Sequence, residues 1–418
     1  MELQITTFGA ILGLAVAIIL IIKKVQPAYS LILGAVVGGL VGGAGLDGTV
    51  STMIGGAKDI MPAILRIVTS GVLAGILIKT GSAAKIAEQI VKKLGEKRAL
   101  FALALATMIL TSTGVFIDIA VITVAPIALA IGKKLNYSKM AILFAMIGGG
   151  KCGNIISPNP NTISAAENFG VELSTLMFAN FIPVLAGLMA TVIVVKFLTK
   201  KGELIQEAVV EENQETLPSF FAAIIGPLVA IILLSLRPLV GITVDPLIAL
   251  PIGGLVGVVA TGKWRNTNEY ITFGLSKMMP VTVLLIGTGA VAGIIKASTL
   301  QTTTISLLNS MNMPEFLLAP ISGILMGAAT ASTTAGTTIA SATFGPAILS
   351  AGIMPLAGAA MVHAGATVLD HLPHGSFFHA TAGATNMNLS ERLKMIPYES
   401  LVGIVITIVS TVIWGILM

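Results

Sequence analysis

Two runs of small and hydroxyl residues interrupt the longest apolar stretches of the chain. The first is Thr111-Ser112-Thr113-Gly114, and the second spans residues 331–336 (ASTTAG). Hydroxyl groups donate and accept hydrogen bonds, and a helix that begins after each break presents free N–H groups and the positive end of its dipole. These features favour an anion such as a carboxylate, although Ser and Thr are also ordinary packing residues between apolar helices. The candidate ligand-binding residues are Ser112, Thr113, Gly114, Ser332, Thr333, Thr334, Gly336 and Thr337.

Two further segments combine proline, glycine and polar side chains in apolar surroundings. They are residues 148–162 (GGGKCGNIISPNPNT) and 365–376 (GATVLDHLPHGS). Proline lacks an N–H and leaves a carbonyl without its helical partner, so each segment is predicted to be unwound and able to hold a ligand or cation. Two exposed loops that cap helices are the alternative. The candidate binding residues here are Asn154, Ser157, Asn159, Asn161, Thr162, His374, Gly375 and Ser376.

Four ionisable residues lie in or beside these breaks, and ionisable groups inside apolar stretches are functional candidates. Asp118 follows the first break by one turn and could pair with Lys151, neutralise a coupling cation, or cap its helix. Lys151 could attract a carboxylate or neutralise Asp118. With Asp370 and His371, these residues are the predicted ion-coupling set.

All four histidines lie within residues 363–379. Histidine titrates near physiological pH, so Asp370, His371 and His374 are candidates to carry a proton. His371 and His374 are three residues apart, but Pro373 between them spoils a regular helical pair of metal ligands, and no metal is expected. The sequence assigns no role to His363 and His379.

The composition defines the class of protein. Of the 418 residues, 55% are hydrophobic and 10% are charged, whereas soluble domains carry about 25% charged residues. The sequence therefore predicts an all-α polytopic membrane protein, embedded in a lipid bilayer. The candidate spans are about 6–23, 28–45, 60–79, 139–158, 174–195, 219–236, 246–261, 278–296, 355–370 and 396–417.

Other function classes find little support. The net charge of +5 comes from basic residues between the apolar stretches, so no nucleic-acid partner is expected. The sequence has no P-loop, no GxSxG and no HExxH motif. We therefore expect neither an enzyme nor an ATP-driven pump, and no cofactor.

The two halves of the chain resemble each other. Residues 72–76 (VLAGI) match 291–295 (VAGII), and Pro126, Pro158 and Pro183 match Pro346, Pro373 and Pro397, in the same order and at similar spacing. We expect a first transmembrane repeat over 1–198, a polar cytoplasmic linker over 199–217 and a second transmembrane repeat over 218–418.

The basic residues predict the orientation, because they favour the cytoplasmic side. Lys23 and Lys24 place the end of the first helix inside. The block 99–132 is basic at both ends and is predicted to be a re-entrant hairpin, as is its counterpart 316–350. Residues 79–98 are basic and their counterpart 297–314 is uncharged, so the second repeat is predicted to be inverted, with both termini outside the cytoplasm. Two inverted repeats, each with a re-entrant hairpin and a discontinuous helix, are typical of secondary transporters, here of the inner (plasma) membrane.

The sequence resembles the gluconate permease (GntP) family of the ion transporter superfamily. The similarity lies in FIDIAVITVAPIALAIGKKL (116–135), SPNPNTISAA (157–166), GTTIASATFGPAI (336–348), DHLPHGSFF (370–378) and NLSERLKMIPYES (388–400). It implies proton symport of a sugar acid or a related hydroxy or amino carboxylate, by an elevator-like movement of a mobile domain within a homodimer. After His371 the chain has LPHGS in place of a polar Asn-Asp-Ser-Gly run, and SPNPN differs from the family's Pro-His-Pro-Gly type. The resemblance therefore indicates a class of organic anion rather than gluconate itself.

Three hypotheses follow. The first is proton-coupled symport of a small organic anion. The second is a sodium/proton antiporter or a sodium-coupled carboxylate symporter of the same superfamily, with Asp118 and Asp370 as ion carriers in the antiporter. The third is a membrane-embedded, metal-dependent enzyme that uses the histidine cluster.

Overall fold

The computed structural model describes residues 4–205, 217–300, 302–303, 306, 310 and 314–418. These residues form helices and turns with two isolated β-bridges, Ile5–Ser298 and Ser138–Leu204. The predicted all-α class is therefore confirmed. The predicted linker, 199–217, falls largely on residues 206–216, which lie outside the described residues.

The first half of the chain contributes eleven α-helices. They are α1 (Thr7–Ile22), α2 (Pro27–Val41), α3 (Gly45–Asp59), α4 (Met61–Lys79), α5 (Ser82–Leu94), α6 (Ala99–Ser112), α7 (Ile117–Leu135), α8 (Lys139–Ile155), α9 (Pro160–Phe169), α10 (Leu173–Ala179) and α11 (Phe181–Leu198), with a short 3-10 turn, η1 (Glu96–Arg98).

The described part of the second half follows the same order. Its elements are α12 (Phe220–Val240), α13 (Pro246–Ala260), η2 (Trp264–Asn266), α14 (Thr267–Lys296), η3 (Glu315–Leu317), α16 (Leu318–Thr330), α17 (Thr333–Ser350), α18 (Pro355–Gly365), α19 (Ser376–Ala384), α20 (Leu389–Leu393), α21 (Ile396–Thr411) and η4 (Val412–Leu417).

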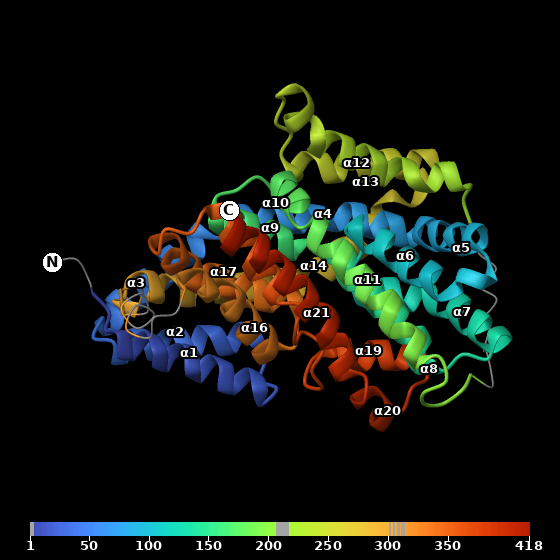
Figure 1. Cartoon of the computed structure of the whole chain (residues 1–418). Helices are drawn as coiled ribbons and strands as arrows, with labels where there is room; N and C mark the ends of the chain where they lie inside the picture. Colours follow the sequence, from blue (N-terminus) through green and yellow to red (C-terminus); the bar gives the residue numbers. More distant parts are fainter. Residues whose placement is uncertain (1–3, 206–216, 301, 304–305, 307–309, 311–313) are drawn as a thin grey trace.

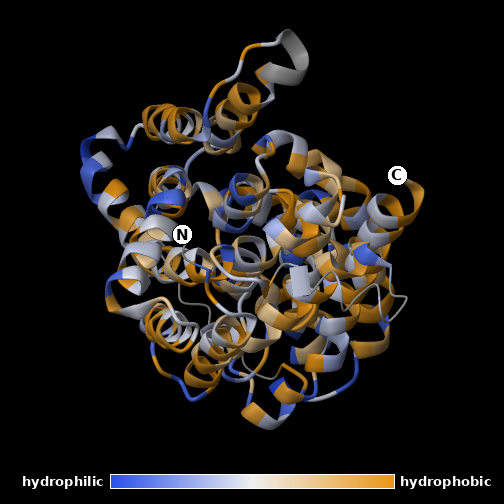
Figure 2. Ribbon diagram, turned by 90° about the vertical axis from the view of Figure 1, so that its left-hand side faces the viewer, coloured by the Kyte–Doolittle hydropathy of each residue, from blue (hydrophilic) through white to orange (hydrophobic). Residues whose placement is uncertain are grey.

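Length and composition suit these helices to a membrane. Five helical stretches are long and apolar enough to cross one: Met61–Lys79, Lys139–Phe169, Phe181–Leu198, Trp264–Lys296 and Leu389–Leu417. Large apolar side chains also point outward, and Phe197 on α11 and Phe221 on α12 are 67% and 76% exposed. Figure 2 shows hydrophobic residues along most helices and hydrophilic ones concentrated in connections and at helix ends. A bilayer would cover such a surface.

The helices pack in two groups (Figure 1). One group, here called the frame, consists of α1–α4 and α12–α14, in which α14 packs against α2, α3 and α4, and α13 packs against α4. The other, here called the hairpin domain, consists of α6–α11 and α16–α21. In it α6 packs against α8, α16 against α17 and α18, and α11 against α21.

Corresponding helices of the two halves begin at a constant spacing. The first residues of α7 and α17, α8 and α18, α9 and α19, and α10 and α20 are 117 and 333, 139 and 355, 160 and 376, and 173 and 389, so the four pairs share one register. The hairpin α6–α7 corresponds to α16–α17, and α1–α2 corresponds to α12–α13. The sequence repeat is thus a repeat of elements as well.

Glycine contacts join α3 and α4 to α14 about a local twofold axis. A Cβ atom built on Gly56 would lie 2.1 Å from the carbonyl oxygen of Gly289, and one built on Gly274 would lie 1.9 Å from that of Gly71. The register that relates Gly56 to Gly274 also relates Gly71 to Gly289. Each contact is therefore the repeat counterpart of the other. Two inverted repeats produce this self-symmetric contact.

The structure corrects the predicted spans at three places. The span predicted over 174–195 is divided at Asn180 into α10 and α11. The sequence missed α3, because its polar and small residues (GLDGTVSTMIGGAKD) hide it from an apolar-span search. The predicted span 278–296 is the second part of α14, which begins at Thr267 and continues through Pro280. Together α3 and α4, separated at Ile60, match this long helix.

Candidate functional site

The hairpin tips are tighter than predicted. The first turn lies between the end of α6 at Ser112 and the start of α7 at Ile117, so Thr111 and Ser112 are still helical. The second consists of Ala331 and Ser332 alone, and residues 333–337 form the first turns of α17. Ala331 adopts a left-handed conformation (φ 45°), which is uncommon without glycine. Ser332 caps α17 by accepting a hydrogen bond from the N–H of Ala335 (3.3 Å).

The two discontinuous helices differ in length of break. The predicted unwound segment 148–162 is mostly helical, because α8 continues to Ile155 and α9 begins at Pro160. Asn159 caps α9 by accepting hydrogen bonds from the N–H groups of Asn161 (3.1 Å) and Thr162 (3.2 Å). In the other half the break is as wide as predicted, running from Ala366 to Gly375 between α18 and α19.

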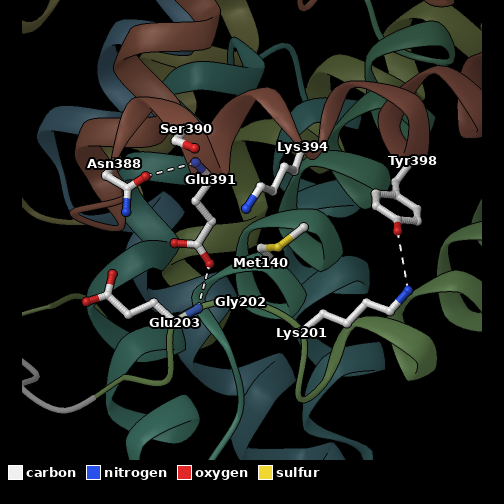
Figure 3. A pocket seen from close by; sticks show the side chains of 9 residues that line it. All are labelled: Met140, Lys201, Gly202, Glu203, Asn388, Ser390, Glu391, Lys394 and Tyr398. Carbon is white, nitrogen blue, oxygen red and sulfur yellow. Dashed lines mark hydrogen bonds between the residues drawn. The ribbon is translucent and has the colours of Figure 1, made fainter.

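A smaller cavity of about 500 Å³ lies away from these breaks, beside α20 and the segment after α11. Figure 3 shows Glu391 pointing toward the backbone of Glu203, whose N–H donates to it at 2.8 Å. Lys201 and Tyr398 face each other across the same space. Nearby, Arg392 forms a fully buried ion pair with Glu399.

The larger cavity, of about 800 Å³, lies between the frame and the hairpin domain. Pockets for small molecules have about this size. Its mouth includes the exposed side chains of Lys24, Lys277 and His379, and we call this the open side. The N-terminal turns of α7, α17 and α19 form part of its wall, so three positive helix ends face one space. The predicted residues that line it are Asp118, Asn154, Ser332, Thr333, Thr334, Asp370, His374, Gly375 and Ser376.

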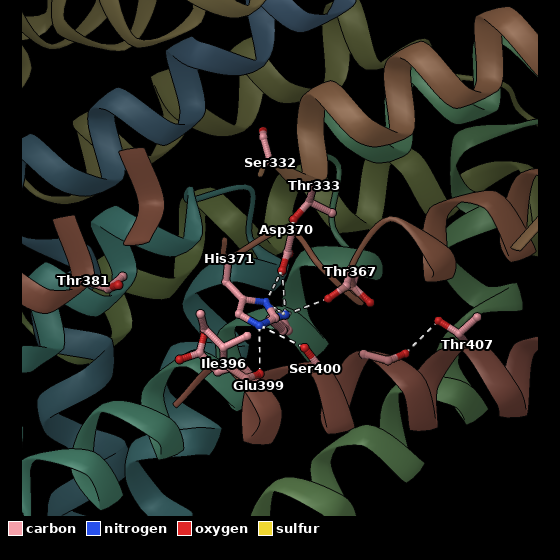
Figure 4. A network of polar contacts seen from close by, with 12 residues as sticks. Ser332, Thr333, Thr367, Asp370, His371, Thr381, Ile396, Glu399, Ser400 and Thr407 are labelled. Atoms are coloured by element: carbon pink, nitrogen blue, oxygen red, sulfur yellow. Dashed lines mark hydrogen bonds and ion pairs between the residues drawn. The ribbon is translucent and has the colours of Figure 1, made fainter. Parts of the chain in front are cut away.

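A buried polar network stands behind this wall (Figure 4). The Lys151 ammonium donates to the Asp370 carboxylate (2.6 Å), to the carbonyl oxygen of Thr367 (2.7 Å) and to Nδ1 of His371 (2.9 Å). The other Asp370 oxygen accepts from the hydroxyl of Thr333, at 2.5 Å. Lys151 and Asp370 are 1% and 4% exposed, so the pair is desolvated, and its mutual attraction and its further hydrogen bonds offset that cost. Asp370 and Thr333 connect this network to the cavity.

The contacts of His371 place one of its ring protons. A backbone carbonyl only accepts, so the contact with Ile396 puts a ring proton on Nε2, whereas Nδ1 lies 2.9 Å from the Lys151 ammonium, which can donate to it, and 3.0 Å from the Asp370 carboxylate, which can only accept. Nε2 then donates to the carbonyl oxygen of Ile396 (3.1 Å), and the hydroxyl of Ser400 lies 3.2 Å away. In the form with no proton on Nδ1, Lys151 and Asp370 balance each other, and the network carries no net charge.

Lys151 pairs with Asp370 and not with Asp118, which decides between the alternatives left by the sequence. Asp118 lies in the first turn of α7, and its carboxylate accepts from the N–H of Ile119 (2.9 Å). In the register of α7 and α17, the counterpart of Asp118 is Thr334, whose hydroxyl donates to Asn161 (2.5 Å). Among the residues that the structure describes, no ion pair engages Asp118, and the residue lines the cavity.

Several predicted binding residues serve the backbone instead of lining the cavity. Ser112 and Thr113 donate to the carbonyl oxygens of Ile109 (2.8 Å) and Leu110 (2.7 Å). Gly114 provides a left-handed turn (φ 98°). The remaining ones pack in the interior or hold the α8–α9 break together: Ser157, Asn159, Asn161, Thr162, Gly336 and Thr337.

The sequence missed the residues that the frame contributes. Lys24, Gln26 and Lys277 line the cavity, but no pattern in the sequence places the α1–α2 connection and α14 opposite the hairpins. His379 also lines it, and its Nε2 lies 2.9 Å from the carbonyl oxygen of Pro373. No cluster of three or more metal-ligating side chains occurs in the described part of the chain.

A polytopic helical fold with a central polar cavity between two helix groups defines a membrane transporter. The family model for GntP family permeases matches residues 5–417, and the chain belongs to this family. It is 58% identical over 414 residues to an uncharacterized transporter of Haemophilus influenzae, with 99% of both chains covered. It is 21% identical to the high-affinity gluconate transporter of Escherichia coli K12, with 96% of this chain and 98% of that protein covered.

The fold also matches a solved transporter structure. The YdaH transporter of Alcanivorax borkumensis, described as having an unusual topology, aligns with a TM-score of 0.68 at 17% identity, covering 90% of this chain and 89% of that chain. At that identity the likeness concerns the fold alone.

Proposed function

We propose that this transporter is a proton-coupled symporter of a small organic anion, such as a sugar acid, a hydroxy acid or an amino acid. The observation that carries the proposal is the buried ion pair of Lys151 and Asp370 with His371 beside it, which reaches the cavity through Asp370. Such a network takes up an added charge more favourably when a second charge of opposite sign arrives with it.

The substrate carboxylate would bind at the start of α17. There the start of the helix and the hydroxyl of Ser332 line the cavity, and that hydroxyl keeps its proton to donate because it only accepts in the cap. The start of α19 at Ser376 adds a second positive helix end. Asp118 would accept hydrogen bonds from the substrate's hydroxyl or amino groups, and Asn154 would donate to them or accept from them.

Charge balance links the substrate to the proton. A proton added at Nδ1 of His371 would donate to the Asp370 carboxylate, 3.0 Å away, and displace the hydrogen bond from Lys151. The network would then carry a net charge of +1 in a buried site, which is unfavourable alone. A bound organic anion offsets that charge, so the proton and the anion bind more tightly together than either does alone.

The cavity wall supports an elevator-like movement. The frame supplies Lys24, Gln26 and Lys277, and the hairpin domain supplies Asp118, Ser332 and Asp370. Displacement of the hairpin domain along the frame would carry the network and the bound anion across the membrane. Basic residues at the mouth, Lys24 and Lys277, favour a cytoplasmic position for the open side.

Reconstitution in liposomes with an internal pH-sensitive dye tests the function. A panel of carboxylates is applied under proton gradients and, separately, under sodium gradients. Internal acidification that depends on one organic anion and not on sodium is the expected result. Proton flux driven by sodium without any organic acid would instead establish antiport, and sodium-dependent uptake without acidification would establish sodium symport.

A further inference from the structure

A three-residue ion cluster joins the frame to the hairpin domain on the side away from the cavity mouth. Arg66 on α4 donates to Asp245 at the start of α13, with Nη2 2.7 Å and Nε 3.1 Å from its oxygens. Arg66 also forms an ion pair with Glu167, near the end of α9. The guanidinium lowers the pKa of Asp245 below its usual value, because it donates hydrogen bonds to that carboxylate.

The cluster has no counterpart on the open side. The three ionic residues correspond to uncharged ones when the repeats are aligned in sequence at three places: Gly56 with Gly274, the start of α2 with that of α13, and the start of α9 with that of α19. The matching pairs are Arg66 with Leu284, Asp245 with Gln26 and Glu167 with Gly383. Leu284 and Gln26 line the open cavity. A Cβ atom built on Gly383 would meet no atom within 4 Å. Positions that hold an ion cluster in one repeat therefore surround an opening in the other.

Helix packing shows the same asymmetry. On the cluster side α9 packs against α4, and α17 packs against α14. The equivalent pairs on the open side are α19 with α14 and α7 with α4. Neither makes comparable contact in the described residues, and the cavity occupies that space.

Buried polar groups mark the closed path. Among the described residues, the hydroxyl of Thr338 and the side-chain nitrogen of Asn161 find no hydrogen-bond partner, and both residues are at most 1% exposed. The counterpart of Thr338, in the register of α7 and α17, is Ile122, which lines the cavity and is 49% exposed. Unpaired polar groups in a closed interior are unfavourable. Water would satisfy them if the cluster side opened as the other side is open here.

We propose that a second entrance to the transport site, closed in this structure, lies between α4–α13 and α9–α17, and that Arg66 and Glu167 form the latch that closes it. The residues have distinct parts in it. Arg66 and Asp245 both belong to the frame and stay paired, so Asp245 is a positioning residue. Glu167 belongs to the hairpin domain, so only the Arg66–Glu167 contact breaks on opening. The inference rests on alternating access and not on the identity of the coupling ion.

Thiol accessibility tests the latch without any substrate. The buried Cys152 makes the parent protein an unreactive background. In intact cells, a membrane-impermeant thiol reagent should modify Thr338→Cys slowly in the parent. When Glu167→Gln is combined with Thr338→Cys, the rate of thiol labelling should rise by about threefold to tenfold, the range expected for loss of one partly buried ion pair. Ile122→Cys, labelled from the opposite face in inverted vesicles, should slow in the same background.

Asp59→Asn is the matched control, because it removes an exposed ion pair to Lys296 that lies within the frame. It should leave both labelling rates unchanged. An equal Thr338→Cys rate with and without Glu167→Gln would overturn the latch, as would an equal increase from Asp59→Asn.

A cross-link provides a second measurement if Glu167→Gln does not fold. A short bifunctional thiol reagent, removable by reductant, should join Arg66→Cys to Glu167→Cys and stop uptake, and reductant should restore it. Full transport by the cross-linked protein would overturn the latch. The labelling assay needs no organic anion. A positive result in it would therefore support the latch even if the liposome experiment showed no proton symport.

Discussion

The ammonium of Lys151 lies 2.6 Å from the carboxylate of Asp370, and the two residues come from opposite halves of the chain. Lys151 is in α8, and its counterpart in the second half is Thr367, whose carbonyl oxygen it also contacts (2.7 Å). A charged residue of the first half, Lys151, thus holds the helix break of the second half, and this contact lies close to the axis that relates the two halves.

Removal of Lys151 should destabilise the protein through the charge left behind. In Lys151→Met, the Asp370 carboxylate would be buried with no counter-ion, and loss of one partner of a buried pair costs about 3–5 kcal/mol. Lys151→Met combined with Asp370→Asn removes both charges and should recover most of the loss. Thermal unfolding in detergent measures both proteins, and equal instability of the single and the double variant would contradict the charge argument.

Changes at Asp370 and His371 should separate exchange from net transport. Asp370→Asn or His371→Gln removes a proton-accepting atom of the network, so anion-driven acidification of liposomes should fall at least about tenfold. Exchange of labelled for unlabelled anion needs no net proton movement and should persist, at altered affinity. Normal pH-dependent uptake in both variants would remove this segment from the coupling mechanism.

The cap of α17 should matter for binding as well as for stability. Ser332→Ala removes the acceptor for the Ala335 N–H and a hydroxyl that faces the cavity. Loss of an N-cap costs about 1 kcal/mol. Ser138→Ala is the control, because Ser138 caps α8 (3.1 Å to the N–H of Ala141) and does not line the cavity, although its hydroxyl also donates to the carbonyl oxygen of Leu198 (2.7 Å).

Ser138→Ala should lose at least as much thermal stability as Ser332→Ala, because it also removes the hydrogen bond to Leu198, yet only Ser332→Ala should raise the KM for uptake, by about threefold or more. An equal KM effect of the two changes would show that the cap acts through the helix alone.

Hydropathy and repeated motifs predicted most of the fold, because apolar helices and paired prolines leave strong local signals. They missed α3, whose glycine and polar residues are determined by its contact with α14 and not by lipid. The pairing of Lys151 with Asp370 was not predictable either, since it depends on how the helix breaks of opposite halves meet in space. The SPNPN segment was predicted to bind a ligand, but Asn159 uses its side chain to cap α9 and to contact Asn154.

Adjacent glycines in α3 allow a controlled test of the axis between the two halves. Gly56→Ala would place a methyl group 2.1 Å from the carbonyl oxygen of Gly289, and such overpacking costs about 1–3 kcal/mol. Gly55→Ala, at the position just before it, meets no atom within 4 Å and should stabilise the helix by up to about 1 kcal/mol.

Because Gly274 is the repeat counterpart of Gly56 and is as tightly packed, Gly274→Ala should lower the thermal midpoint to a similar extent. A harmless Gly56→Ala, or a Gly274→Ala as mild as Gly55→Ala, would mean that the crossing of the long helices is looser than the structure has it. A matched loss at both positions would demonstrate that equivalent glycines of the two halves carry the same contact.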